Sequence, residues 1–197
     1  NNIMTLKHNL NEKFQDNLKE NVSLANYSWF NLGGKAEYFF KAEDKTQLIH
    51  FLKEIKTHDL STTIVGTGSN ILYRDNGVKE VVIKLGKNFS FTELIGKNII
   101  EAGGATPDKK IADFAKDNNL SNLEFLSCIP GLIGGGIIMN SGCYENDISK
   151  VLLSIKAIDK SNFKEIEIKK EDINFLYRGT NLSKNLIITS VQLRGEV

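Results

Sequence analysis

The 197-residue chain has few of the residues on which metal centres, disulfide frameworks and basic surfaces depend. Its three histidines, His8, His50 and His58, are scattered and form no HExxH or HxH pattern, so the sequence indicates no metal site. Its two cysteines, Cys128 and Cys143, lack CxxC spacing and do not suggest a disulfide framework. A protein that binds nucleic acid is expected to carry an excess of basic residues, so the net charge of +1 argues against such a partner.

Long apolar runs are also absent. No stretch approaches the roughly 20 residues that a membrane-spanning helix needs. The N-terminal stretch NNIMTLKHNLNEKF has no continuous apolar region, so we expect no secretory signal. A hydrophobic content of 41% is enough for the core of one large domain or two small ones. We therefore expect a reduced, cytoplasmic globular protein with no membrane partner.

Helix signals occur at three places. Apolar residues recur every three to four positions near the N-terminus and predict an amphipathic helix over residues 1–20. Asp44, with Gln47 three residues later, forms a capping box and predicts a helix start. Thr106 as the cap and Pro107 as the first helical residue predict a second such start, continuing through DKKIADFAKDN.

Strand signals lie between and after these helices. Short runs rich in β-branched or aromatic residues, some alternating with period two, are AEYFFKA, TTIV, EVVIKL, NIIEA, SIKAIDK, FKEIEIKK and LIITSVQL. The mixture predicts an α+β (mixed α/β) fold. We expect two subdomains, residues 21–88 and residues 89–197.

The first glycine loop, residues 66–70, reads GTGSN and follows the strand-like TTIV. Glycines there allow backbone N–H groups to converge on phosphate oxygens, and Ser69 and Asn70 add side-chain donors. The dinucleotide fingerprint GxGxxG fails, because Ile71 stands at the third glycine position. On spacing alone, a ligand loop and an ordinary strand-end turn both remain open.

The second glycine-rich stretch, PGLIGGGIIMNSGCY, covers residues 130–144 and holds five glycines. Each glycine in a regular element costs about 0.5–1 kcal/mol relative to alanine. The apolar residues on both sides indicate that this expected loop lies inside the protein. Its glycines would lie against a flat or phosphate-bearing ligand, or they would allow two chain segments to pack closely. Asn140 would bond a ligand or its own loop. Farther on, Arg178, directly after Tyr177, has a guanidinium group suited to binding an anion.

Together these stretches resemble the MurB family of UDP-N-acetylenolpyruvoylglucosamine reductases. The family pattern contains G-x-GSN-x-L, L-E-x-L-x-x-IPG-x-x-GGA-x-x-x-N-x-G-A-Y-G and F-x-YR-x-S. This chain reads GTGSNIL, LEFLSCIPGLIGGGIIMNSGCYE and FLYRGT in the same order. SWFNLGGKAEYF also matches the family's T-x-x-x-x-GG-x-A segment. The resemblance runs from about residue 20 to the end of the chain.

The resemblance implies the two-subdomain FAD-binding fold of the vanillyl-alcohol-oxidase (PCMH) type. FAD would be non-covalent, because no histidine lies in a glycine loop. Arg178 matches the family arginine that stabilises developing negative charge on the substrate, and Tyr177 matches the adjacent substrate-side tyrosine. The positions that match the flavin-binding motifs are Gly66, Thr67, Gly68, Ser69, Asn70, Ile71, Pro130, Gly131, Ile133, Gly134, Gly135, Asn140 and Gly142.

The implied reaction uses NADPH to reduce FAD, which then reduces the enolpyruvyl group of a UDP-sugar to form the peptidoglycan precursor UDP-N-acetylmuramate. Family members continue into a third domain with a GS-x-F-K-N-P motif, which this chain lacks. We expect the chain to bind FAD but to turn over substrate poorly without a missing or separately encoded C-terminal domain. A flavin-binding remnant, or another oxidoreductase of the same superfamily, is the alternative. Cys143, Glu145 and Thr180 stand where the family usually has Ala, Gly and Ser.

Overall fold

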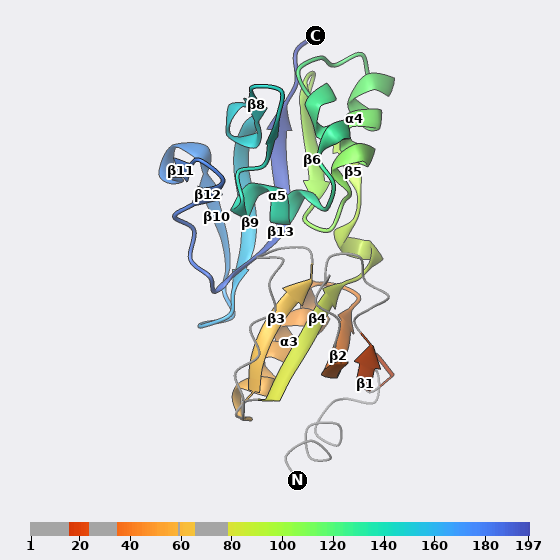
Figure 1. Ribbon diagram of the computed structural model, residues 1–197, viewed down its shortest axis with the longest axis vertical. Coiled ribbons are helices and arrows are strands. Elements are labelled where there is room, and N and C mark those ends of the chain that lie inside the picture. Colours follow the sequence, from red (N-terminus) through yellow and green to blue (C-terminus); the bar gives the residue numbers. More distant parts are fainter. Residues whose placement is uncertain (1–15, 24–34, 59, 66–78) are drawn as a thin grey trace. The chain divides into compact units, whose positions relative to one another are not determined.

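The computed structural model describes residues 16–23, 35–58, 60–65 and 79–197. The described chain forms two compact units, one from residues between 16 and 86 and the other from Lys87–Val197. Both contain strands and helices (Figure 1), so the expected α+β class is confirmed.

The first unit is a four-stranded sheet with one helix described beside it. In spatial order its strands are β1 (Leu18–Ser23), β2 (Lys35–Ala42), β4 (Lys79–Leu85) and β3 (Leu60–Val65). β2, β4 and β3 are parallel, and β1 is antiparallel to β2. Helix α3 (Lys45–Lys56) connects β2 to β3, which lie on either side of β4, because parallel strands of one sheet need a crossover connection.

The predicted capping box begins α3. The Gln47 backbone amide donates to Asp44 Oδ1 over 2.8 Å, and Gln47 Oε1 accepts from the Glu43 amide over 2.9 Å. The buried face of the helix includes Phe51, whose ring stacks on Phe40 of β2 with centroids 3.8 Å apart. This stacked pair anchors α3 to the sheet by burying two large apolar rings.

The helix expected over residues 1–20 is wrong at its C-terminal end, because Leu18–Ser23 is strand β1. Leu18 is buried and stands opposite Phe40 in the antiparallel ladder. Pairing with β2 satisfies the backbone here and outweighs the helical spacing. Residues 1–15, which carry the rest of that prediction, lie outside the described residues.

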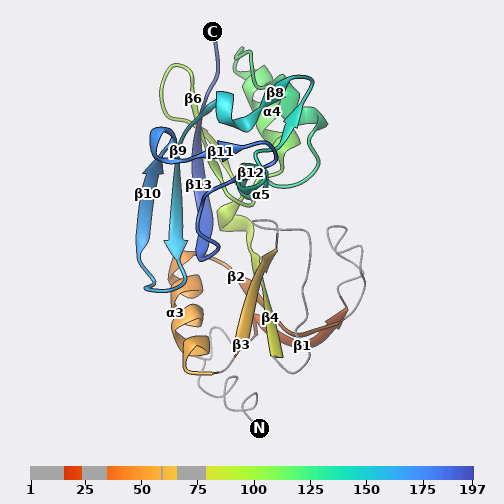
Figure 2. The ribbon, with the colours of Figure 1, turned by 60° about the vertical axis from the view of Figure 1, so that its left-hand side comes forward.

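The second unit is built on a five-stranded antiparallel sheet. In spatial order its strands are β10 (Glu165–Lys169), β9 (Leu152–Asp159), β13 (Leu186–Arg194), β6 (Ile99–Gly103) and β5 (Thr92–Leu94). These strands include four of the predicted runs. Central strand β13 is buried over most of its length. Figures 1 and 2 show α4 (Asp108–Asp117) and α5 (Ile133–Ile138) on the same side of this sheet.

Short elements complete the second unit. They are η2 (Lys87–Phe89), η3 (Glu124–Cys128), η4 (Ile148–Lys150), η5 (Lys170–Asp172) and two hairpins, β7–β8 (Gly142–Cys143 with Asn146–Asp147) and β11–β12 (Phe175–Leu176 with Gly179–Thr180). The core between sheet and helices includes the fully buried Ile111, Ile133, Ile155 and Ile188.

Thr106 does not cap α4 as expected, since Pro107 occupies the N-cap position and Asp108 is the first helical residue. The buried Thr106 hydroxyl instead accepts from the Phe91 amide and donates to the Phe91 carbonyl, both over 3.0 Å. A buried hydroxyl needs hydrogen-bond partners, and these two bonds supply them. They also link the start of α4 to the segment before β5.

Candidate functional site

Within the glycine-rich stretch, residues Ile133–Ile138 form a short helix, α5, so the expected loop is wrong over these residues. Ile133 and Ile137, one helical turn apart, are fully buried against the core under β6 and β13. Glycine is a poor helix former, so isolated propensity disfavours this helix. Tertiary burial of its apolar side stabilises it instead.

The start of α5 is held by the turn that follows β6. The Ile133 amide donates to the Thr106 carbonyl and the Gly134 amide to the Gly104 carbonyl, each over 2.9 Å. Gly104 itself lies against β13, where a Cβ would stand 2.0 Å from the Ile188 carbonyl oxygen. A side chain at this position would separate the turn from the sheet. Sequence reasoning missed the role of this Gly-Gly turn, although its place directly after a strand was the signal.

Close packing explains two glycines of the stretch, and backbone conformation explains a third. A Cβ on Gly136 would stand 2.8 Å from Ile148 Cδ1, and one on Gly142 would stand 2.5 Å from the Asn146 carbonyl oxygen. Gly131 has a φ of +111°, a conformation that other residues rarely adopt. Close packing and backbone conformation thus account for Gly131, Gly136 and Gly142.

Backbone near the centre of α5 is available for a ligand. The Gly136 amide closes the first helical turn on the Leu132 carbonyl, whereas no backbone hydrogen bond within the described residues uses the Gly135 amide. Gly135 is half-buried and Gly134 is buried, while Pro130 before them is exposed. The first amides of a helix lack intrahelical partners and glycine itself adds no side chain, so the Gly135 amide is a candidate donor to a polar ligand atom.

The β11–β12 hairpin is attached to the end of α5. Buried Asn140 donates from Nδ2 to the Leu176 carbonyl over 3.0 Å, and its Oδ1 accepts from the Ser149 amide over 3.3 Å. The Thr180 hydroxyl donates to the Ile138 carbonyl over 3.3 Å. Asn140 thus bonds to protein groups beyond its own loop, in the β11–β12 hairpin and at Ser149.

Tyr177 and Arg178 form the turn of this hairpin and lie beside the glycine stretch. Tyr177 is 91% exposed. The Arg178 guanidinium carbon lies 5.1 Å from the centre of the Tyr177 ring, and its Nη1 is 2.9 Å from the position of a Cβ on Gly142. Among the described residues, no carboxylate pairs with Arg178. The structure thus brings Asn140, Gly142, Tyr177 and Arg178 together.

The other predicted glycine loop, with Gly66, Thr67, Gly68, Ser69, Asn70 and Ile71, lies outside the described residues.

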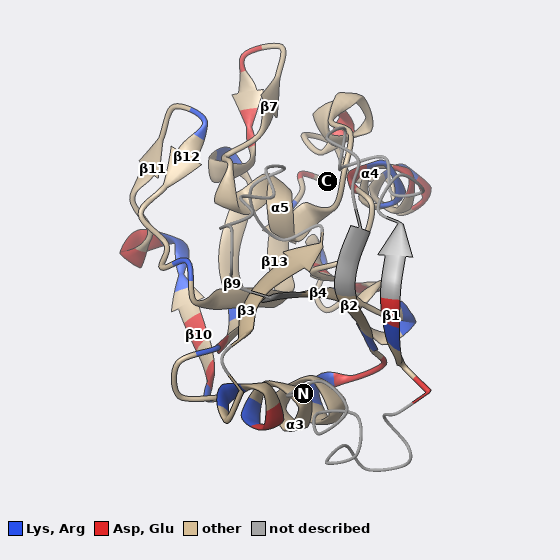
Figure 3. Cartoon of the chain, turned by 60° about the horizontal axis from the view of Figure 1, so that its bottom comes forward, with Lys and Arg blue, Asp and Glu red and all other residues tan. Residues whose placement is uncertain are grey.

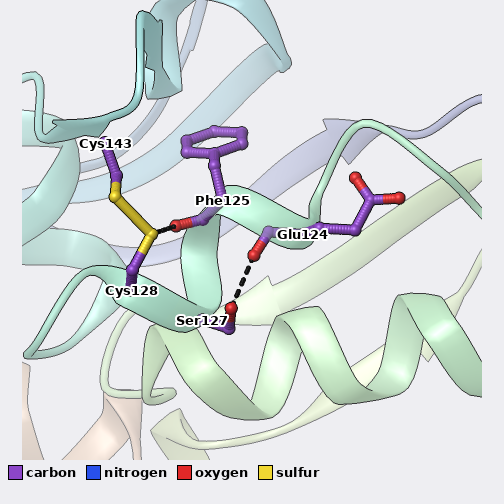
Figure 4. The surroundings of a disulfide bond; sticks show 5 residues. All are labelled: Glu124, Phe125, Ser127, Cys128 and Cys143. Carbon is purple, nitrogen blue, oxygen red and sulfur yellow. Dashed lines mark hydrogen bonds between the residues drawn. A yellow bond between two sulfur atoms is a disulfide. The ribbon is translucent and has the colours of Figure 1, made fainter.

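Cys128 and Cys143 are joined in a disulfide, so the expectation of two reduced cysteines is wrong. Figure 4 shows the bond linking the end of η3 to β7. The two Cα atoms are 6.5 Å apart, within the range that a disulfide spans. The two cysteines are 15 positions apart in the sequence. The bond therefore closes a loop around α5.

Asp108 is a buried acid that sequence reasoning did not single out. Its side chain is fully buried, and neither carboxylate oxygen has a hydrogen-bond partner among the residues that the structure describes. Oδ2 would lie 3.6 Å from a Cβ on Gly136 of α5. Burial raises the pKa of this carboxyl from 3.8 to about 8. Desolvation therefore favours the protonated form of this acid.

No group of three or more potential metal ligands is present among the described residues. The helices that the structure describes are too short or too polar to cross a bilayer. Acidic and basic residues are interspersed along α3, α4 and β10 (Figure 3). Figure 3 also shows a basic residue in the β11–β12 turn and an acidic one in the β7–β8 turn.

Residues 36–162 match a family described as "FAD binding domain". Among curated proteins, UDP-N-acetylenolpyruvoylglucosamine reductase of Pelagibacter ubique is 40% identical over 187 residues, which are 93% of this chain and 61% of that protein. The Rickettsia felis protein of the same name is 43% identical over 171 residues, 86% of this chain and 57% of that protein. The chain thus spans about three fifths of the length of these relatives.

Solved structures agree on the fold. UDP-N-acetylenolpyruvylglucosamine reductase from Thermus caldophilus has a TM-score of 0.72 and 25% identity, covering 91% of this chain and 63% of that one. p-Cresol methylhydroxylase has a TM-score of 0.65 at 12% identity, covering 98% of this chain and 43% of that one. These similarities confirm the expected FAD-binding fold of the vanillyl-alcohol-oxidase type.

Proposed function

Because this chain belongs to the family of FAD-binding domains, we propose that it is the flavin-holding part of a UDP-N-acetylenolpyruvoylglucosamine reductase. The whole enzyme would use NADPH to reduce the enolpyruvyl group of a UDP-sugar to UDP-N-acetylmuramate, a peptidoglycan precursor. The observation that carries this proposal is the attachment of the Tyr177-Arg178 turn to the end of the glycine helix. A substrate anion at Arg178 would then lie beside the segment proposed to hold the flavin.

The described residues fit a flavin. α5 presents backbone without side chains at two successive glycines, and the Gly135 amide is left without a backbone acceptor in the described chain. Phosphate oxygens bind well to such amides. The residues that would hold FAD are Pro130, Gly131, Ile133, Gly134, Gly135 and Gly142, together with residues 66–71. Asn140, also expected to bind FAD, is not counted with them because both ends of its amide bond to the protein. Bound FAD would accept hydride from NADPH and supply it to the substrate.

Arg178 would bind and orient the substrate. Its guanidinium has no carboxylate partner in the described chain and rests beside the Tyr177 ring. A planar guanidinium can donate two parallel hydrogen bonds to a carboxylate, such as that of an enolpyruvyl group. The same charge would stabilise negative charge that develops on this group during reduction. Tyr177, exposed at the turn, would line the substrate side.

The test is an absorption spectrum of the purified chain after addition of FAD and removal of free flavin. We expect a bound-flavin spectrum that Gly134→Val abolishes, because a branched side chain would occupy the ligand's space. Gly96→Val is the matched control, since a Cβ there meets nothing closer than 3.9 Å. Anaerobic NADPH should then bleach the band. If the unaltered, folded chain retains no flavin, the proposal is wrong.

A further inference from the structure

Asn140 lies at the junction between α5 and the β11–β12 hairpin, and both ends of its amide bond to the chain. Only 5% of the residue surface is exposed. Nδ2 donates to the Leu176 carbonyl and Oδ1 accepts from the Ser149 amide. A buried amide engaged on both sides fixes the segments that it joins.

The hairpin by itself is too small to hold its turn in place. Each strand has two residues, and even a longer isolated hairpin is marginally stable in water. Its attachments are the packing of Phe175 on the core, the bond from Thr180 to Ile138 and the bond from Asn140 to Leu176. Leu176 adjoins the turn directly. The Asn140 bond therefore holds the backbone directly before the turn residues Tyr177 and Arg178.

Arg178 is the turn residue whose direction depends on this attachment. Its backbone has a φ of 58°, and its guanidinium lies close to Gly142, two residues beyond Asn140. No carboxylate among the described residues holds the guanidinium from another side. Its direction is consequently set by the backbone of the turn and by the ring of Tyr177.

We propose that Asn140 is a positioning residue for Arg178 and thereby sets the affinity for an anionic enolpyruvyl group without touching flavin or substrate. The inference rests on the proposed function, because that function assigns the anion to Arg178. Without the Asn140 bond, the Leu176 carbonyl turns to water and the guanidinium samples directions away from Gly142. One ordinary hydrogen bond corresponds to about a tenfold change in an equilibrium.

Asn140→Asp tests the bond selectively. The carboxylate still accepts from the Ser149 amide but has no N–H group for the Leu176 carbonyl. Thr180→Val removes the bond from the hairpin to the Ile138 carbonyl, together with the one that the Leu182 amide donates to the same hydroxyl, without adding charge, and it replaces N140D if that variant fails to fold. Asn162→Asp adds the same charge at an exposed turn between β9 and β10 and serves as the matched control.

The FAD affinity of each variant is measured first, followed by its affinity for UDP-N-acetylglucosamine enolpyruvate and by hydrogen exchange of residues 175–180. We expect N140D to bind FAD like the unaltered chain, to exchange faster in the hairpin and to bind the enolpyruvyl substrate about tenfold more weakly. In an Arg178→Ala background, N140D should cause no further loss, because both changes act on one contact. N162D should match the unaltered chain.

Two results overturn the inference. Loss of FAD by N140D with unchanged hairpin exchange makes Asn140 a flavin ligand. Independent, multiplying effects of Asn140 and Arg178 on substrate affinity show that they do not act through each other. If the unaltered chain binds FAD but not the enolpyruvyl substrate, the proposed function fails instead. Hairpin exchange in N140D then decides by itself whether Asn140 holds the turn.

Discussion

Replacing Asp108 with asparagine should stabilise the chain in a pH-dependent way. Asp108 begins α4 and is fully buried, and within the described part of the chain neither of its carboxylate oxygens has a hydrogen-bond partner. Burial raises the pKa of its carboxyl from 3.8 to about 8 because the charged form loses its hydration. Asparagine has nearly the same shape and does not ionise, so the variant removes this effect and little else.

The magnitude follows from the two pKa values. The folded state holds a proton that the unfolded state releases, so stability falls as pH rises from about 4 to about 8 and then levels off. Each pKa unit corresponds to about 1.4 kcal/mol, which makes the full loss about 6 kcal/mol and the loss at pH 7 about 4 kcal/mol. Asp108→Asn should recover most of the loss at pH 7.

Urea unfolding of the flavin-free protein at pH 5, 7 and 8.5 measures this difference. The stability advantage of D108N over the unaltered chain should grow from about 2 kcal/mol at pH 5 to about 4 kcal/mol at pH 7. Asp113→Asn, on the exposed side of the same helix, controls for loss of a charge near α4. An advantage that stays constant across this pH range would refute the reasoning, whatever its size.

Three further changes have expected effects on stability. Reducing the Cys128–Cys143 disulfide opens a loop of about 15 residues and should lower the unfolding free energy by about 3 kcal/mol. Urea unfolding with and without a thiol reductant measures this loss, and a double Cys→Ser variant should not respond to the reductant. Glu145→Gly should raise stability by about 0.5–1 kcal/mol in a thermal melt, because Glu145 has a φ of 64°; a lower melting temperature would contradict this. Gly104→Ala should lower stability by at least about 2 kcal/mol, because its Cβ would meet a β13 carbonyl. Gly96→Ala should be nearly neutral in the same melt, because its Cβ would meet nothing closer than 3.9 Å.

The sequence predicted those parts whose determinants lie within a few residues of each other. The Asp44 and Gln47 pair marked the start of α3 because a capping box is a local arrangement. LIITSVQL identified β13 because β-branched residues favour extended backbone wherever they are buried. The glycine and Tyr-Arg motifs indicated the family for a similar reason, since residue identity at fixed spacing is directly visible in a sequence.

Tertiary structure alone decided the parts that depend on distant partners. Residues 18–23 form a strand because β2 is available to pair with them, and α5 is helical although three successive residues in it are glycines. The Cys128–Cys143 bond and the buried Asp108 carboxyl likewise depend on what the fold places beside them. The spacing of residue types along the sequence does not predict such contacts. Their free energy comes from pairing and burial between segments that only the complete fold brings together.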